Sequence, residues 1–455
     1  MWFFCSVATS PFGTRFLFLR HGNPSSDFTR RKKGRSAEIF IMPTGTTQRL
    51  LKNAPLLLIL MAALAVRAAF IHHWGSTLTL GSDDVGYIDS ARRLVTDHVF
   101  SWWRPRLCPE PALGPSAYTT PGYPLFLSLF IWLFSEEPRA LAAARYAQAL
   151  LMVGSVYLTY LIARRFGGRY AGLLPAALVA FYPPLILING LLLTETLFAF
   201  LLLLFTYHWV KAEPGNTGSY ALLGILGAAA ALVRPTGALL CFAAFCGLLL
   251  ALRSRRHPRK AVLRSAAVFF VTFCLVLSPW VIRNALLFHR FIPLSAGGGN
   301  PLLLGTYVNL EGIKYGWHPA WPVGKDPMET ARLHTALGLK RLERGFRGEF
   351  GRYFEWYTRG KFKLLWAKVF LWGGEGKLPC RLAFWYHYTI VALGSFGLVC
   401  GLVRRLPGAG QILGLLALFT IVHLVTYAHC RYALPLLPVL ASAGAMSLAP
   451  RRLSF

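Results

Sequence analysis

Long apolar runs dominate the pattern of hydrophobic and polar positions. From Pro55 onward, runs close to the roughly 20 residues that a helix needs to cross a bilayer recur along the chain. They are continuous rather than alternating, which excludes the period-two pattern of a membrane β-barrel. The pattern therefore predicts an all-α polytopic membrane protein, a bundle of about ten transmembrane helices. The predicted spans are 54–74, 141–163, 170–188, 190–210, 219–235, 236–252, 261–281, 384–403, 411–428 and 432–448.

One apolar run is too short to be counted among these spans. It extends from Pro121 to Phe134, about 14 residues, whereas a crossing helix needs about 20. Prolines open the run, and Glu136-Glu137-Pro138 closes it. We predict a helix that lies along the membrane interface.

The basic residues between the spans indicate the orientation. Clusters at 164–169, 253–260 and 404–405 all fall on one side if the N-terminus is cytoplasmic and 121–134 does not cross. Cytoplasmic loops carry the excess of Lys and Arg, so this side is inside. Both termini are then cytoplasmic, and two large loops, 75–139 and 283–383, are extracytoplasmic. The basic, aromatic part of the second loop, 332–372, is expected to form helices.

The same reading divides the chain into four parts. Residues 1–41 form a poorly structured N-terminal extension without the pattern of a signal peptide, and Met42 is an alternative start of translation. The other parts are a transmembrane module (42–282) that includes the first outer loop, the second outer loop (283–383) and C-terminal transmembrane helices (384–455).

Composition agrees with a membrane protein and narrows the partners. The chain is 55% hydrophobic and 15% charged, with a net charge of +30. The basic residues lie in short clusters between apolar runs, and no nucleic-acid-binding module is apparent, which argues against a nucleic-acid partner. Anchoring to anionic membrane lipids and binding of phosphate both remain open. The sequence has no P-loop and no HExxH motif, so it gives no support for a P-loop pump or a zinc protease.

The first outer loop contains an acidic pair. Asp83 and Asp84 open a predicted helix, whose N-terminal dipole favours their charged form, and Tyr87 shares the face of Asp83. A carboxylate beside the membrane surface is a natural general base for an acceptor hydroxyl. The alternative is a capping pair on a surface helix. The expected apolar face of this helix is Val85, Ile88, Ala91 and Val95.

Further charged side chains lie in apolar runs or at their outer ends. Such residues are functional candidates because an ionisable group in a membrane is costly. Arginines on one face could form a clamp for phosphate, although each alone could simply extend to lipid headgroups. The candidates for substrate binding are Arg145, Glu195, Arg234, Arg283, His429 and Arg431. No cofactor is predicted; a divalent metal stays open, because Asp83, Asp84 and Glu195 could offer oxygen ligands, but no spacing argues for it.

Seven short motifs follow one another along the chain: Asp83-Asp84-x-x-Tyr87, Tyr118–Leu125, Thr194-Glu195, Arg234-Pro235-Thr236, Pro279–Asn284, Phe291–Ser295 and Arg431–Pro438. Together and in this order, they resemble the motifs of the membrane glycosyltransferases with the GT-C fold. The resemblance covers about residues 50–450 and is greatest to the branch that uses polyprenyl-phosphate sugars, which includes the protein O-mannosyltransferases and the aminoarabinose transferases (family 39-like). Two positions depart from the family pattern: Asp84 replaces the commoner Glu, and Thr120 replaces a Lys or His.

This resemblance implies a GT-C-type bundle and a glycosyltransferase of the bacterial inner membrane. A sugar would move from a polyprenyl-phosphate donor to an extracytoplasmic glycolipid, polysaccharide or protein, with inversion. Asp83 would be the catalytic base, Asp84 its partner or a positioning group, and arginines such as Arg234, Arg283 and Arg431 would offset the departing phosphate. Two alternatives stay open: a flippase or transporter of lipid-linked sugars, and a ligase for a whole glycan.

Overall fold

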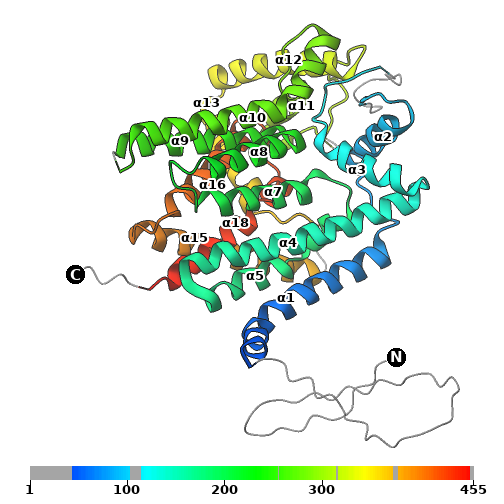
Figure 1. Ribbon diagram of the computed structural model, residues 1–455. Coiled ribbons are helices and arrows are strands. Elements are labelled where there is room, and N and C mark those ends of the chain that lie inside the picture. Colours follow the sequence, from blue (N-terminus) through cyan, green and yellow to red (C-terminus); the bar gives the residue numbers. More distant parts are fainter. Residues whose placement is uncertain (1–43, 103–113, 255, 314–315, 372–377, 451–455) are drawn as a thin grey trace, which may run out of the picture. The chain divides into compact units, whose positions relative to one another are not determined.

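The computed structural model describes residues 44–102, 114–254, 256–313, 316–371 and 378–450 (Figure 1). All regular elements in these ranges are helices, without a strand. The chain divides into two compact units, Met1–Leu58 and Ile59–Phe455, and α1 (Thr44–Trp74) runs from the first unit into the second. The predicted extension 1–41 lies outside the described residues. Everything below concerns the second unit.

The helices of this unit follow the predicted order of spans and loops. In the first part of the unit they are α2 (Asp83–Thr96), α3 (Gly122–Phe134), α4 (Glu137–Ala171), α5 (Leu173–Ala180), α6 (Pro183–Gly190), α7 (Thr194–Trp209), α8 (Thr217–Val233), η1 (Pro235–Gly237), α9 (Ala238–Ser254) and α10 (Arg259–Phe288). The rest are α11 (Gly299–Gly305), η2 (Val308–Leu310), α12 (Pro327–Gly348), α13 (Phe350–Glu355), η3 (Trp356–Gly360), α14 (Lys361–Trp366), α15 (Leu378–Val403), α16 (Ala409–Val425), α17 (Cys430–Ala433), α18 (Leu437–Ala443) and η4 (Gly444–Leu448).

The helices confirm an integral membrane protein of the all-α class. Five described helices are long and apolar enough to cross a bilayer, or six if the bent pair α5–α6 counts as one span. Four shorter apolar helices accompany them: Gly122–Phe134, Thr217–Val233, Ala409–Val425 and Leu437–Leu448. The predicted count of about ten spans is thus not confirmed, because several predicted spans correspond to helices shorter than a bilayer requires.

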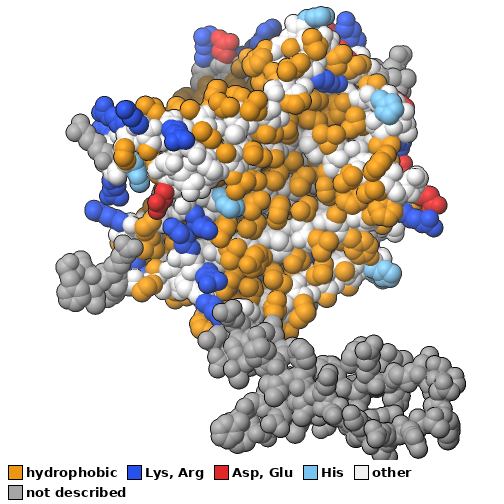
Figure 2. All heavy atoms as spheres, viewed as in Figure 1, with side chains coloured by type: hydrophobic (Ala, Val, Ile, Leu, Met, Phe, Trp, Pro, Cys, Tyr) orange, Lys and Arg blue, Asp and Glu red, His pale blue; other side chains and the backbone are white. Residues whose placement is uncertain are grey.

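Exposed apolar side chains mark the surface that would face lipid. Figure 2 shows hydrophobic side chains across the middle of the visible face, with Lys and Arg gathered toward its margins. Phe242 and Phe245 on α9 and Phe270 and Leu286 on α10 are all at least half exposed. So much contiguous apolar exposure is costly in water and favourable in a bilayer.

The break between α5 and α6 has a local cause. Pro183 and Pro184 open α6 and hold Tyr182 in an extended conformation, so the two helices meet at 50°. The backbone carbonyls left free at the end of α5 need donors, because lipid supplies none. Arg67 of α1, which is fully buried, donates to the Ala180 carbonyl at 2.7 Å and to Asn189 Oδ1 at 2.8 Å.

Close helix packing is possible where side chains are small. α8 lies alongside α10, and α4 alongside α5 and α7 (Figure 1). At Gly224 of α8 a Cβ atom would collide with Thr272 Oγ1 and with the Phe269 carbonyl of α10. A larger residue there would force the two helices apart.

The second outer loop is helical where the sequence predicted helices. α12, α13, η3 and α14 cover most of residues 327–366. Lys361, fully buried, fastens this region to the end of α16 by donating to the carbonyls of Leu424 (2.9 Å) and Thr426 (2.8 Å). A lysine is favourable there, because the last carbonyls of a helix carry partial negative charge and have no partner within the helix.

Candidate active site

Asp84 shapes the turn that leads into α2. Its side chain is buried and accepts hydrogen bonds from Thr79 Oγ1 (2.6 Å), the Leu80 amide (2.7 Å) and the Ser82 amide (2.8 Å). Both carboxylate oxygens are therefore used within the 79–84 segment. These contacts make Asp84 a residue that positions its neighbour, Asp83, rather than one that is open to a ligand.

We expect Asp84→Asn to lower the free energy of unfolding by about 1–3 kcal/mol, because an amide nitrogen cannot accept the bonds that a carboxylate oxygen accepts. Thermal unfolding of the purified protein in detergent measures this change. Unchanged stability would contradict the structural role.

Asp83 is the first of four charged side chains that are linked in a row by ion pairs. Arg431 Nη2 donates to Asp83 Oδ2 at 2.7 Å, and Arg431 Nε lies 3.1 Å from Glu195 Oε1. The same Glu195 oxygen accepts from Arg234 Nη1 at 2.9 Å. The Asp83–Arg431–Glu195–Arg234 bridge thus alternates in sign and has no net charge. Asp83 is its most exposed member, with 32% of its side chain accessible, and Glu195 its most buried, at 2%.

Helix ends hold the two carboxylates of the bridge. Asp83 is the first residue of α2, and Glu195 lies in the first turn of α7. The partial positive charge at a helix N-terminus favours a carboxylate there. The aromatic rings of Phe198 and Tyr432 lie 5.7 and 5.1 Å from the Arg234 guanidinium, which adds cation–π attraction.

Buried amides hold the segment that enters α7. Gln148 of α4 donates to the carbonyls of Asn189 (3.1 Å) and Leu191 (2.9 Å), and Asn189 donates in turn to Thr196 Oγ1 (3.2 Å). Tyr123 of α3 donates to Gln148 Oε1 at 2.9 Å. This network provides donors for the backbone carbonyls at the end of α6. It therefore fixes the start of α7, where Glu195 lies.

A pocket opens beside the exposed member of the bridge. Its volume is about 470 Å³. Asp83 and Arg431 both line it, which means that the carboxylate and one guanidinium face the same space. The other lining residues are Leu80, Gly81, Ser82, Asn300, Pro301, Leu304, Gly316, Phe370, Tyr427, His429 and Tyr432.

The charge states around the pocket follow from burial and from the bridge. Burial, and then the charge of Arg431, lowers the pKa of His429 to about 4, so this ring is neutral at pH 7. Its Nδ1 accepts from the Arg431 amide at 3.1 Å, as an N-cap of α17. Burial lowers the pKa of Arg431, but Glu195 and Asp83 outweigh it and raise that pKa above the ordinary value. Burial and the charge of Asp83 raise the pKa of Tyr87, which therefore stays a neutral phenol.

The remaining predicted residues have other contacts. Tyr87 packs edge to face on Trp102 and Tyr123, with ring centroids 5.0 and 5.1 Å away. Arg283 donates to the carbonyls of Ser116 (2.8 Å) and Phe100 (3.1 Å), so it anchors the first outer loop to α10.

Arg145 donates through Nε to the Gly190 carbonyl at 2.8 Å and lines a different pocket. Of the four arginines expected to form one clamp, Arg234 and Arg431 are the two that contact the predicted carboxylates. The other two, Arg145 and Arg283, donate to backbone carbonyls instead.

The predicted helix at the acidic pair exists, and its expected apolar face is buried in part. Ala91 is buried and Ile88 and Val95 are half-buried, but Val85 is 52% exposed, and Asp84, Gly86 and Ser90 are buried as well. Gly86 is buried because the Trp102 ring lies where a Cβ would be. The aromatic ring of Trp102, from the loop that follows this helix, packs against its buried face.

A metal could be held only where free acidic or imidazole ligands converge. Among the described residues, no group of three or more His, Cys, Asp and Glu side chains is arranged to hold an ion. Glu195 Oε2 is buried without a hydrogen-bond partner, but its other oxygen accepts from two arginines. The bridge therefore supplies its carboxylates with guanidinium groups as counterions.

The sequence analysis did not identify several residues that shape the site. Arg67 interrupts the apolar run of α1, and a lone charge in a span is a signal that could have found it. Tyr427, Phe370 and Asn300 carry no such signal, since aromatic and amide residues are common near membrane surfaces. They reach the pocket only through the fold.

Comparisons with known proteins agree with the fold and with part of the sequence pattern. Residues 118–282 match the sequence model of the family described as dolichyl-phosphate-mannose-protein mannosyltransferase. No curated protein matches the chain in sequence.

Solved structures share the fold at low sequence identity. The apo oligosaccharyltransferase of Archaeoglobus fulgidus superposes with a TM-score of 0.55 and 14% identity over 88% of this chain and 50% of that one. The same organism's oligosaccharyltransferase AglB, in complex with an inhibitory peptide and a dolichol-phosphate, gives 0.54 and 15% over 88% and 50%. The chain thus spans about half the length of these enzymes. ArnT from Cupriavidus metallidurans, bound to undecaprenyl phosphate, gives 0.42 and 15% over 87% and 78%.

The expectation from the motifs is confirmed at this level. The fold is that of the archaeal oligosaccharyltransferase, and the family pattern covers α3 to α10, including Glu195, Arg234 and the turn at Tyr118–Leu125. The chain thus shares the fold of these membrane enzymes, and its residues 118–282 carry the pattern of a mannosyltransferase family.

Proposed function

We propose that the chain transfers a sugar from a polyprenyl-phosphate donor to a hydroxyl-bearing acceptor on the extracytoplasmic side, with Asp83 as the general base. The observation that supports this most is the pocket of about 470 Å³ in which Asp83 and Arg431 lie 2.7 Å apart. A carboxylate and a guanidinium facing one space can accept a proton and stabilise a developing phosphate charge.

The step needs one proton acceptor and one anion stabiliser. The acceptor oxygen forms a bond to the anomeric carbon while the bond from that carbon to the phosphate oxygen breaks, and its electron pair leaves with the phosphate. The hydroxyl proton passes to Asp83. Asp83 can be a weak base despite Arg431, because the hydroxyl becomes acidic only as the bond to the sugar forms. The guanidinium of Arg431 lies where it can offset the charge of the departing phosphate.

The accessibility of the two carboxylates favours inversion. A retaining mechanism needs a second carboxylate that can attack the anomeric carbon. Glu195 has 2% of its side chain exposed, and one of its oxygens is shared by Arg234 and Arg431. Asp83 is the more accessible carboxylate of the bridge, which favours a single displacement.

The donor class and the side of the membrane rest on separate arguments. A dolichol-phosphate is present in the complex of the archaeal oligosaccharyltransferase AglB, and the matching family is described as acting with dolichyl-phosphate-mannose. We extend to this chain only the shared chemistry, a sugar on a lipid phosphate. The extracytoplasmic orientation is favoured by the basic clusters at 164–169, 253–260 and 404–405, which the predicted spans put opposite the loop that carries Asp83.

The test is a screen of lipid-phosphate sugars with the purified, reconstituted protein. We expect one donor class to give polyprenyl phosphate release that depends on an acceptor, with the sugar recovered on that acceptor. Release without any loss of acceptor would indicate hydrolysis. Movement of an intact lipid-linked sugar across the vesicle, without release, would replace the proposal with a flippase, and transfer of only whole glycans would replace it with a ligase.

A further inference from the structure

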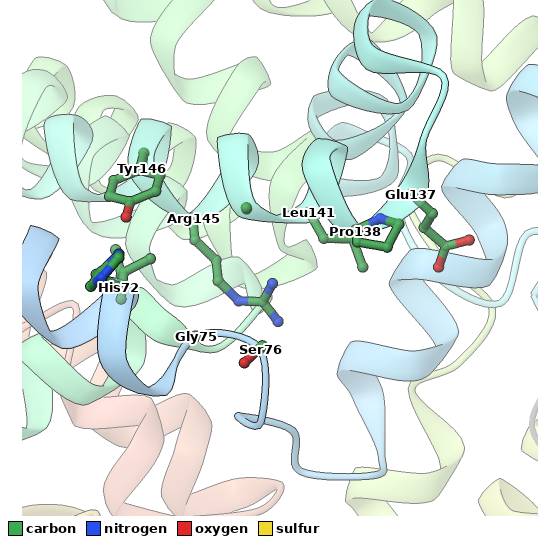
Figure 3. Close-up of a pocket in the computed structure, with 10 residues that line it drawn as sticks. His72, Gly75, Ser76, Glu137, Pro138, Leu141, Arg145 and Tyr146 are labelled. Carbon is green, nitrogen blue, oxygen red and sulfur yellow. The ribbon is translucent and has the colours of Figure 1, made fainter.

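A second pocket lies between the outer end of α1 and the start of α4 (Figure 3). Its volume is about 640 Å³. The Gly75–Ser76 turn forms one wall, and the segment that follows this turn, 80–83, lines the pocket beside Asp83. Neighbouring parts of one short stretch of the chain, 75–83, therefore line the two pockets.

The second pocket is lined by one buried charged side chain, that of Arg145. The residue is 8% exposed, and Figure 3 shows its side chain extending from α4 toward the Gly75–Ser76 turn. Nε is used by the Gly190 carbonyl, while Nη1 and Nη2 make no hydrogen bond or ion pair to the described residues. An unpaired buried charge is expensive, so the protein keeps it for a ligand or compensates for it elsewhere.

Two nearby carboxylates leave the Nη groups of Arg145 free to donate. Glu137 lines the same pocket, but both of its oxygens bind Arg92, at 2.9 and 3.0 Å. The charge of the buried Asp84 acts on Arg145, but its oxygens accept hydrogen bonds within the 79–84 segment. Ser76 and Tyr146 offer hydroxyl groups, while Ile71 and Leu141 provide an apolar wall. One guanidinium with two free donors, hydroxyl groups and an apolar wall, at the end of two membrane spans, match an anionic headgroup with a hydrocarbon chain.

The free donors of Arg145 distinguish this pocket from the one beside the bridge. In the bridge each arginine already contacts a carboxylate, whereas the two Nη groups of Arg145 have no hydrogen-bond partner among the described residues. We propose that this second pocket binds the phosphate of a membrane lipid through the two Nη groups of Arg145, with the chain of the lipid along Ile71 and Leu141.

The shared chemistry is a phosphate ester on a lipid, and two sources can supply it: the polyprenyl-phosphate carrier and a bilayer phospholipid. The inference needs neither source to be the donor of the proposed transfer. It depends on the geometry of this pocket, and Asp83 has no part in it.

Native mass spectrometry of the full chain tests the site with three probes: undecaprenyl phosphate, phosphatidylglycerol and undecaprenol, which has the same tail as the first but no phosphate. We expect at least about tenfold better retention of a phosphate lipid than of undecaprenol. Arg145→Gln should remove that preference. Ala142→Phe, which fills the pocket without altering the Arg145–Gly190 contact, should remove it as well.

The matched control is Arg139→Gln. Arg139 lies on the same helix, but it is 73% exposed and pairs with the exposed Glu136, so its loss should change neither retention nor folding. Loss of undecaprenyl phosphate alone in the two pocket variants identifies the carrier as the source, and loss of phosphatidylglycerol alone identifies the bilayer.

Three results overturn the site: retention of both phosphate lipids by Arg145→Gln and Ala142→Phe, equal retention of undecaprenol by the wild type, or loss of the phosphate lipid in Asp83→Asn. The last result would locate the lipid phosphate in the pocket of the bridge. Because binding is read without transfer, an inactive donor screen leaves the test intact.

Discussion

Replacing Asp83 with asparagine should lower sugar transfer by about 10²–10⁴-fold, the usual contribution of a positioned proton acceptor. The amide keeps the size of the side chain and can still accept the hydrogen bond from Arg431, whose Nε stays 3.1 Å from Glu195. The fold should therefore survive. Initial rates of acceptor glycosylation, with thermal unfolding measured alongside, separate the loss of chemistry from a loss of structure.

Asp89 provides the matched control for this variant. It lies on the same helix and pairs with Arg93 at 3.0 Å, but it does not line the pocket. Asp89→Asn should thus retain activity within a few-fold of the wild type. Full activity of Asp83→Asn, or equal losses in the two variants, would remove Asp83 from the role of base.

Replacing Arg431 with alanine should have the largest effect on stability. Arg431 is the member of the bridge that contacts both carboxylates, and its side chain is 13% exposed. Without it, Asp83 has no guanidinium from the bridge, and the buried Glu195 keeps Arg234 alone. Breaking a buried pair from one side typically costs about 3–5 kcal/mol, and we expect a loss of unfolding free energy in that range together with a loss of transfer.

An arginine in a similar arrangement on the surface gives the control. Arg352 also bridges two carboxylates, Glu349 and Glu311, each at 2.8 Å, but its side chain is 50% exposed. Arg352→Ala should lower the unfolding temperature much less than Arg431→Ala does, because water solvates the released carboxylates. Equal unfolding temperatures for Arg431→Ala and Arg352→Ala would show that burial does not matter to the bridge.

A double substitution checks the electrostatic origin of the loss. Adding Glu195→Gln to Arg431→Gln removes the buried carboxylate that the single variant leaves short of a partner. The double variant should recover part of the stability without recovering transfer. The stability of Arg431→Lys should lie between those of the wild type and Arg431→Gln. Lysine keeps the positive charge, but it lacks the planar guanidinium that contacts both carboxylates.

Much of the architecture could be read from the sequence, because lipid imposes simple rules. Continuous apolar runs imply helices, and the short run at 121–134 appears as α3. The lengths of the individual helices were less predictable. Pro183 and Pro184 could have warned of the break before α6, yet the buried Arg67 that satisfies the broken end comes from a helix over a hundred residues earlier. That compensation is a property of tertiary packing.

The site shows the same division between what a motif can and cannot predict. Glu195, Arg234 and Arg431 are candidates because charges in a membrane are costly, and Asp83 is one because it is a carboxylate at the start of a helix. The fold joins these four side chains. Arg145 and Arg283 meet the same criterion but bind backbone carbonyls instead. No pattern in a sequence tells which acceptor a guanidinium will find. Asp84 differs from Asp83 for a similar reason, since only the course of the 79–84 turn directs its oxygens inward.

The contact between Asp83 and Arg431 joins residues 348 positions apart. During synthesis, α2 and α7 leave the ribosome long before α17, so both carboxylates remain without their common partner until residue 431 has been made. A nascent chain stalled before residue 431 holds an acidic side chain in its interior with a single counterion. Quality-control proteases that recognise incompletely packed membrane segments should therefore degrade such products quickly, whereas a chain that includes Arg431 should resist them.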